Sequence, residues 1–115
     1  MDERLEKAIE FGNYRQTLAN QKRNVKSRMD TLLKVHYNSG SFVASPETIS
    51  FIKTMIDCGK TELILLDAHD SPVEITDLND FLDTLIASYT EASNEYKTHI
   101  TRINKSRSIK KLMDW

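Results

Sequence analysis

The strongest periodic pattern in the chain is LNDFLDTLIASYTEASNEYKTHITRI, which occupies residues 78–103. Apolar and amphipathic side chains recur in it at alternating spacings of four and three, which places them on one side of an α-helix. They are Leu78, Leu82, Leu85, Tyr89, Ala92, Tyr96, His99 and Ile103, with Phe81, Ile86 and Ile100 beside them. We therefore predict a long helix over residues 77–113, capped at its start by Thr76 or Asp77.

A weaker pattern of the same kind runs through residues 2–37, which contain no proline and one glycine, Gly12. Its apolar positions are Phe11, Leu18, Val25 and Leu32, with Tyr14, Met29 and Val35 on the adjacent side. Gln21 and Arg28 interrupt the stripe, because a coiled-coil seam requires apolar side chains there. The pattern predicts a second long helix, roughly 50 Å in length at the usual rise per residue.

Residues 38–76, between the two helices, carry the turn signals of a small head. Asn38-Ser39-Gly40-Ser41 ends the first helix, and a short extended piece is expected at Phe42 and Val43. Ser45 followed by Pro46 is a helix start, and the apolar spacing predicts a short helix over 46–58. Gly59 is its expected end.

The second half of the head contains two apolar runs that predict a β-hairpin over residues 62–75. The runs are Leu63–Leu66 and Val73–Ile75, separated by the turn-forming residues 68–72. The first run is apolar on both faces of a strand, so another element must cover it. We expect the preceding short helix to do so.

The charge distribution supports one arrangement of these elements. Sixteen Lys and Arg stand against seventeen Asp and Glu, a net charge of −1 that excludes a polycation. By segment the net charge is −2 over residues 1–11, +5 over 12–36, −9 over 37–96 and +5 over 97–115. An antiparallel pairing of the long helices brings the acidic start beside the basic end. In that register Leu32 lies near Phe81 and Leu82, and Val25 lies near Tyr89.

The predicted fold is therefore mainly α, a long antiparallel helical hairpin of the coiled-coil type. A small α+β head, made of the short helix and the β-hairpin, lies at its tip. The 115 residues, with a mass of 13.3 kDa, leave room for one domain over residues 1–115. Three glycines and two prolines argue against a turn-rich β protein.

One cluster resembles a metal or acid–base site: Asp67, His69 and Asp70. These residues fall in the expected hairpin turn, where aspartate is favoured for local hydrogen bonding. Glu95 and His99 lie one turn apart, which is not the Glu-x-x-His spacing of di-iron bundles. No nucleophile triad or Gly-rich phosphate loop is present in the sequence. We expect no enzyme activity, no metal and no cofactor.

A basic face on the first long helix is the strongest candidate for nucleic-acid binding. It consists of Arg15, Lys22, Arg23, Lys26 and Arg28. Arg15, Lys22 and Lys26 share one side of the helix, and neighbouring amide side chains could also reach phosphates. The alternative is that these bases are a solvated surface, or are satisfied by the acidic middle of another subunit.

The apolar stripe of the last helix indicates a protein interface. Two helices alone do not enclose Phe81, Ile86 and Ile100, which lie beside the seam. We therefore expect a homo-oligomer or docking on a larger protein. The expected interface residues are Leu78, Phe81, Leu82, Leu85, Ile86, Tyr89, Tyr96, Ile100, Ile103 and Trp115.

The sequence also indicates where the protein acts. Its first residues are acidic where a signal peptide is basic, and its longest aliphatic run, Leu63–Leu66, is too short for a membrane span. The single cysteine, Cys58, forms no intrachain disulfide. We expect a cytoplasmic protein without a membrane partner.

Two resemblances add to this interpretation. The helix–hairpin–helix order is similar in layout to prefoldin subunits, which implies a chaperone, although the helix at 46–58 departs from that layout. The segments MDERLEKA at residues 1–8, ETISF at 47–51, ELILLD at 62–67, EASNEY at 91–96 and KLMDW at 111–115 resemble a small protein of large contractile-tailed marine phages, of the cyanophage type. That resemblance implies a viral context, in infected cytoplasm or in the virion, and carries no site.

The leading hypothesis is a non-catalytic assembly or interaction protein of a phage, acting through oligomerisation of the helical hairpin. A nucleic-acid-binding accessory factor and a prefoldin-like chaperone are the alternatives.

Overall fold

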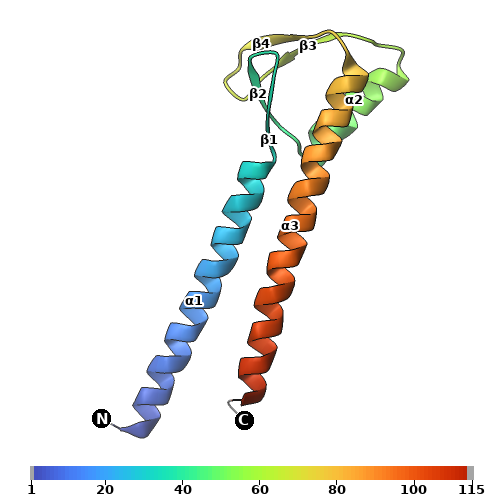
Figure 1. Ribbon diagram of the computed structural model, residues 1–115. Coiled ribbons are helices and arrows are strands. Elements are labelled where there is room, and N and C mark those ends of the chain that lie inside the picture. The colour runs from blue at the N-terminus through green and yellow to red at the C-terminus, as the bar shows by residue number, and fades with distance from the viewer. Residues whose placement is uncertain (1, 114–115) are drawn as a thin grey trace. The chain divides into compact units, whose positions relative to one another are not determined.

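The computed structural model describes residues 2–113, and the side chains of residues 2–106. Within that part of the chain the fold is mainly helical, with three helices and two antiparallel sheets of two strands each (Figure 1). The elements are α1 (Glu3–Leu32), β1 (Lys34–Tyr37), β2 (Gly40–Val43), α2 (Pro46–Asp57), β3 (Leu63–Leu66), β4 (Pro72–Ile75) and α3 (Leu78–Met113). The predicted class, mainly helical with a small α+β part, is confirmed at this level.

The chain divides into two compact units. Unit 1 comprises Met1–Arg28 and Glu95–Trp115, and unit 2 comprises Met29–Asn94. Unit 2 therefore contains both sheets, α2, the last turn of α1 and the first half of α3.

The first long helix is shorter than predicted, because residues 34–43 form a β-hairpin. β1 and β2 pair with Tyr37 opposite Gly40, which leaves Asn38 and Ser39 as a two-residue turn. Both turn residues have positive φ, 47° and 68°, as hairpin turns of this length require. Val35 lies opposite Phe42 in this hairpin, and both are buried. The prediction of helix through residue 37 was wrong.

The other boundaries of unit 2 agree with the sequence. Ser45 caps α2, since its side chain accepts a hydrogen bond from the Thr48 N–H at 3.2 Å. Gly59 follows the end of α2 with a φ of 87°. β3 and β4 pair antiparallel as predicted. Asp77 is the cap of α3, because its carboxylate accepts from the Asp80 N–H at 3.1 Å.

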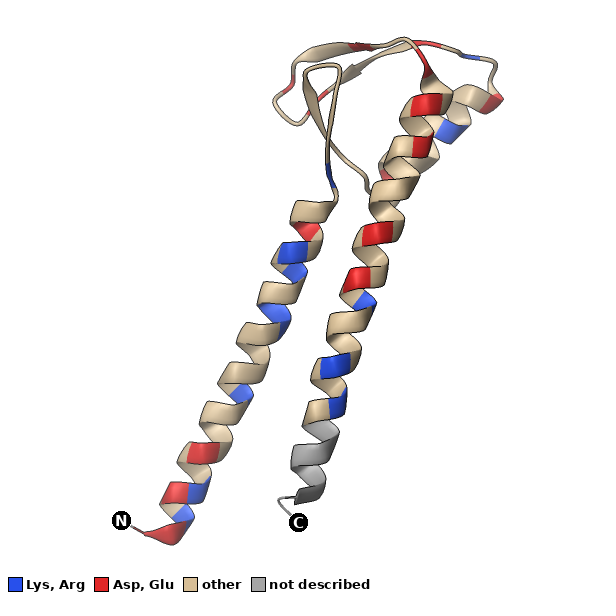
Figure 2. Ribbon diagram, in the orientation of Figure 1, with Lys and Arg blue, Asp and Glu red and all other residues tan. Residues whose placement is uncertain are grey.

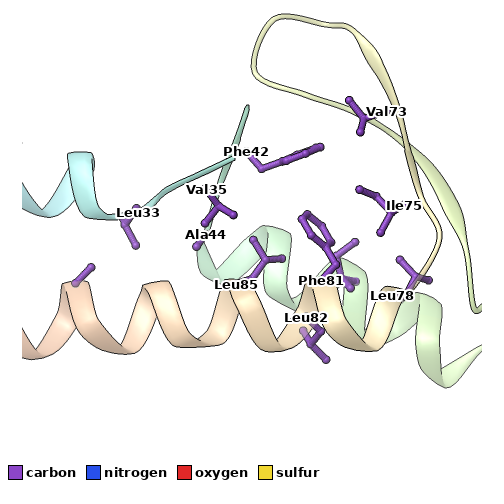
Figure 3. Packing of buried hydrophobic residues seen from close by; sticks show 12 residues of the cluster. Leu33, Val35, Phe42, Ala44, Val73, Ile75, Leu78, Phe81, Leu82 and Leu85 are labelled. Carbon is purple, nitrogen blue, oxygen red and sulfur yellow. The ribbon is translucent and has the colours of Figure 1, made fainter. Parts of the chain in front are cut away.

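The core of unit 2 is built around Phe81, which is fully buried (Figure 3). Its ring makes an edge contact with Phe42, with ring centroids 5.1 Å apart, and a tilted contact with Tyr37 at 4.9 Å. The Tyr37 hydroxyl donates to Asp80 Oδ2 at 2.7 Å, which anchors the β1–β2 hairpin to α3. The remaining buried hydrophobic residues are Leu33, Val35, Ala44, Ile52, Val73, Ile75, Leu78, Leu82, Leu85 and Ala92.

Unit 1 consists of two helical segments that run in opposite directions (Figure 1). None of the residues of α1, all of which the structure describes, is buried. In the part of α1 that belongs to unit 1, four residues are half-buried and form what we call the inward stripe: Tyr14, Leu18, Lys22 and Val25. Phe11, expected in the seam, is 60% exposed.

The register within unit 1 differs from the predicted one. Arg28 Nε donates to Glu95 Oε1 at 3.0 Å. The predicted pairing of Val25 with Tyr89 places Arg28 opposite Ile86, which lies nine residues before Glu95 in α3. The rings of Tyr37 and Phe42, from the β1–β2 hairpin, contact Phe81 in the first turns of α3. The predicted register was wrong at Arg28, which bonds to Glu95 rather than lying opposite Ile86.

Candidate functional site

An apolar groove on unit 2 is the best candidate for a binding site. It is an open hollow of about 350 Å³ between the end of β2, the first turns of α2 and the end of β3, hereafter the β2–β3 groove. Its apolar side chains include Val43, Phe51, Leu65 and Leu66. Glu47 and Thr48, from the first turn of α2, also line it. The hollow is therefore mainly apolar, with polar side chains supplied by the start of α2 and by Asp67 at the end of β3.

The apolar side chains of this region are unusually exposed. Val43 is 44% exposed, Phe51 43% and Leu66 60%. Ile64, two residues before Leu66 and on the same face of β3, is 65% exposed. Scattered exposed apolar residues are ordinary, but a group of them around one hollow is characteristic of an interaction surface.

Strand alternation explains why these side chains face solvent. In β2, Phe42 points into the core and its neighbour Val43 points outward. In β3, Leu63 and Leu65 pack against the core, which leaves Ile64 and Leu66 on the opposite face.

The short helix was expected to cover this strand, but the outer face of β3 is exposed, at Ile64 and Leu66. The apolar side of α2 is directed into the core of unit 2, where Ile52 is fully buried and Ile49 and Ile56 pack beside it. A single apolar stripe contacts one surface only, so the outer face of β3 has no cover from α2.

Asp67 fixes the shape of the groove at the end of β3. Its Oδ1 accepts from the backbone N–H groups of His69 at 2.9 Å and Ser71 at 3.0 Å, which closes the β3–β4 turn. Its Oδ2 accepts from the Ser41 N–H at 3.1 Å, and the Ala68 N–H donates to the Ser41 carbonyl at 2.7 Å. The two hairpins are therefore joined through Asp67 and Ala68.

The same contacts account for the cluster considered as a metal site. The amide of Ser71, followed by that of Ser41, lowers the pKa of Asp67 below its usual range. Three backbone amides thus occupy both carboxylate oxygens. Asp70 has a φ of 60°, so it is a turn residue. Among the residues with described side chains, no group of three or more His, Cys, Asp or Glu is arranged to hold a metal ion.

Unit 2 is strongly acidic. Residues 29–94 contain eleven Asp and Glu against three Lys and no Arg, a net charge of −8. Figure 2 shows acidic positions on the β3–β4 hairpin and the first half of α3. Of the three lysines, Lys53 is paired with Asp57 at 3.1 Å. The β2–β3 groove therefore lies in a negative field, which attracts basic ligands.

The five residues of the predicted basic face have different surroundings in unit 1. Arg28 is bound to Glu95, and this hydrogen bond is the main reason that the pKa of Glu95 lies below its usual range. Lys22 is half-buried in the inward stripe. The Arg15 guanidinium lies over the Phe11 ring, 5.9 Å from its centroid.

Arg23 and Lys26 complete the set and are exposed on α1. The structure thus places Arg15, Arg23 and Lys26 at the surface, and turns Lys22 and Arg28 toward other parts of unit 1.

The predicted interface residues are also divided. Leu78, Phe81, Leu82 and Leu85 belong to the core of unit 2. Tyr89 is half-buried against that core, and Tyr96, Ile100 and Ile103 are half-buried in unit 1. Ile86 is 43% exposed. Trp115 lies outside the described residues.

This distribution changes the argument for oligomerisation. The premise that Phe81 needs a further helix was wrong, because the two β-hairpins cover it. Self-association through α3 stays a prediction, and sedimentation of the purified protein at micromolar concentration tests it. A compact monomer would contradict it.

The groove residues Val43, Glu47, Phe51 and Leu66 were not among the predicted site residues. The two-faced apolar run at residues 63–66 was the signal that could have revealed them. A strand with no polar face requires a cover, and the chain supplies a cover for one face only.

Comparison of the chain with protein-family models, curated proteins and solved structures finds no match. No helix in the described part of the chain is long and apolar enough to cross a membrane. The resemblances to a phage protein and to prefoldin therefore remain predictions.

Proposed function

We propose that this protein is a non-catalytic interaction module that binds a basic partner protein through the β2–β3 groove of unit 2. The observation that carries the proposal is the coincidence of an uncovered apolar hollow with a net charge of −8 on the same unit. Apolar contact supplies most of the affinity in such interfaces, and opposite charge supplies partner choice and a fast approach.

The proposal is tested by affinity capture from the cells or infected cells that make the protein. Two variants introduce the same charge at similar exposure. Phe51→Lys changes the groove, whereas Ile9→Lys changes α1, and the native side chains are 43% and 46% exposed. We expect basic proteins captured by the native chain to be retained by Ile9→Lys and lost with Phe51→Lys. Capture unaffected by Phe51→Lys would refute the proposal.

A phage structural or accessory role is the biological setting we propose for such a module. The resemblance of the segments at residues 1–8, 47–51 and 62–67 to a phage protein supports it. Identification of the captured partner by mass spectrometry tests this setting, because a virion or phage-replication protein is expected. A partner that belongs to an uninfected cell would contradict a viral role.

Nucleic-acid binding by unit 1 is the second candidate. Its residues carry thirteen Lys and Arg against six Asp and Glu, a net charge of +7. We expect binding to DNA that weakens as salt rises and is lost on charge reversal at Arg23 and Lys26, which are exposed on α1. Reversal of Lys53 and Lys60 in unit 2 is the control. Absence of binding at low salt would remove this candidate.

A further inference from the structure

The hydrogen-bond register of β3 shows which of its backbone groups face the groove. The Asp67 N–H donates to the Ser71 carbonyl at 3.0 Å and closes the β3–β4 hairpin. Hydrogen-bonded pairs alternate along an antiparallel ladder, so Leu65 and Leu63 also bond to β4. The N–H and C=O groups of Ile64 and Leu66 therefore point to the other edge of the strand.

The position of Pro72 agrees with this register. Pro72 lies opposite Leu66 and has no N–H to donate. A proline is tolerated at this place because the pair Leu66–Pro72 is not a hydrogen-bonded one.

The corresponding edge of β2 faces the same groove. Hydrogen-bonded pairs also alternate along the β1–β2 hairpin, counted from the pair next to the turn. The backbone N–H and C=O groups of Ser41 and Val43 therefore point to the outer edge of β2. Ser41 uses both of its groups, one with Ala68 and one with Asp67. The two strand edges thus meet at Ser41 and Ala68, and separate from there along Val43 and Leu66 with the groove between them.

We infer that the β2–β3 groove binds an extended peptide segment in which basic and apolar residues alternate, and that the segment adds as a strand to the edge of β3. This inference rests on the proposed function, because it specifies the kind of partner that the groove takes. Strand addition satisfies the outward backbone groups of Ile64 and Leu66.

Alternation follows from the pleat of the added strand. Its side chains point in turn to opposite faces, so every second one enters the hollow lined by Phe51 and Leu66. The others face solvent or the carboxylate of Glu47 in the first turn of α2. Lysine or arginine at these positions complements the charge of unit 2.

The probe is a short, capped, fluorescent peptide of alternating lysine and valine. Two further peptides carry N-methyl groups on all valines or on all lysines, which removes the N–H groups of one edge or the other without changing charge or side chains. We expect at least one methylated peptide to bind about tenfold more weakly than the parent, since lost backbone hydrogen bonds carry that cost. Equal binding of all three would overturn strand addition.

Amide hydrogen exchange on the native chain gives a second readout. Strand addition is expected to slow exchange of the Ile64 and Leu66 amides when the parent peptide is bound. No added protection at these two amides would overturn the inference. If protection of these two amides rises with protein concentration in the absence of peptide, the inference would also be overturned. That result would show that a second copy of the chain binds to the edge of β3.

Protein variants separate this inference from the proposed function. Phe51→Lys should weaken binding of the parent peptide about tenfold, since it removes an apolar contact and adds a charge of the same sign as the peptide, whereas Ile9→Lys, on α1, should leave it unchanged. Glu47→Gln should reduce the salt dependence of binding, and Glu91→Gln, on α3, is its control. If capture of basic proteins depends on Phe51 but N-methylation has no effect, the proposed function stands and strand addition fails. If capture does not depend on Phe51, the proposed function itself fails.

Discussion

Gly40 lies opposite Tyr37 beside the hairpin turn, and the side chains of the core crowd against it. A Cβ atom at this position would lie 2.7 Å from Val73 Cγ2 and 2.9 Å from a ring carbon of Phe42. We expect Gly40→Ala to lower the free energy of unfolding by about 1–3 kcal/mol, because the core must shift to admit the methyl group. Denaturant unfolding of the two proteins measures this difference.

Gly12 is the control for this substitution. It lies within α1, and a Cβ built there meets nothing within 4 Å. Gly12→Ala should favour the helix by about 0.5–1 kcal/mol, since alanine loses less backbone entropy on folding. Destabilisation by both substitutions, or by neither, would contradict the structural difference between the two glycines.

Asp67 makes stability depend on pH. Its pKa in the folded protein lies below the unfolded value, chiefly because the Ser71 and Ser41 amides donate to the carboxylate. The stabilisation is therefore complete above the unfolded pKa and is lost as the pH falls through the folded pKa. We expect Asp67→Asn to lower the melting temperature at neutral pH, since an amide nitrogen cannot accept from the Ser41 N–H.

The melting-temperature difference between Asp67→Asn and the native chain should shrink as the pH falls through the folded pKa of Asp67. Asp70→Asn is the matched control, because Asp70 is in the same turn and its carboxylate makes none of these bonds. A pH-independent difference, or an equal effect of Asp70→Asn, would argue against the assigned role of Asp67.

At the level of elements, local capping and turn chemistry predicted most of the fold. Ser45 and Pro46 predicted the start of α2, Gly59 predicted its end, and the apolar runs predicted β3 and β4. These signals are local, because each is a side chain that satisfies a nearby backbone group or fixes a nearby φ. The β1–β2 hairpin was missed although Asn38 and Ser39 form a two-residue turn.

The reason for this error is that the apolar residues at 32 and 35 also continue a helical spacing. A helix through residue 37 satisfies that local pattern equally well. The strand is favoured in the structure because Val35 and Phe42 bury their side chains against α3, which is a contact between elements distant in sequence. Tertiary burial thus overrides the local preference.

The attachment of the β1–β2 hairpin to α3 gives a prediction at this scale. The hydrogen bond to Asp80 raises the pKa of Tyr37 to about 12. Tyr37→Phe keeps the ring beside Phe81 and removes only the hydroxyl, so we expect a loss of about 0.5–1.5 kcal/mol in the free energy of unfolding. Spectroscopic titration of the native chain should show one tyrosine that ionises near pH 12. A normal titration of all tyrosines would contradict this contact.

For the whole molecule, the sequence predicted the segregation of charge but not the groove. Counting bases and acids needs no structure, and the acidic middle of the chain corresponds to unit 2. The groove, in contrast, combines Val43 from β2, Phe51 from α2 and Leu66 from β3. Its existence depends on which face of β3 is covered, and that is determined by how the apolar side of α2 packs.

The unequal distribution of buried residues between the units predicts unequal local stability. All twelve buried hydrophobic residues with described placement belong to unit 2, whereas α1 has no buried residue. Local opening costs little free energy where few apolar contacts are broken. We expect the amides of residues 7–28 to exchange with solvent much faster than the amides of Phe42 and Leu85, in a hydrogen-exchange experiment resolved by residue.

The salt dependence of amide exchange distinguishes the contribution of ion pairs from that of apolar burial. The Arg28–Glu95 ion pair of unit 1 is partly solvent-exposed, so salt should weaken it and speed exchange in residues 7–28. Exchange in the apolar core of unit 2 should change little, because burial of Phe42 and Leu85 does not depend on charge. Equal protection of the two units at all salt concentrations would show that apolar contacts also hold unit 1 together.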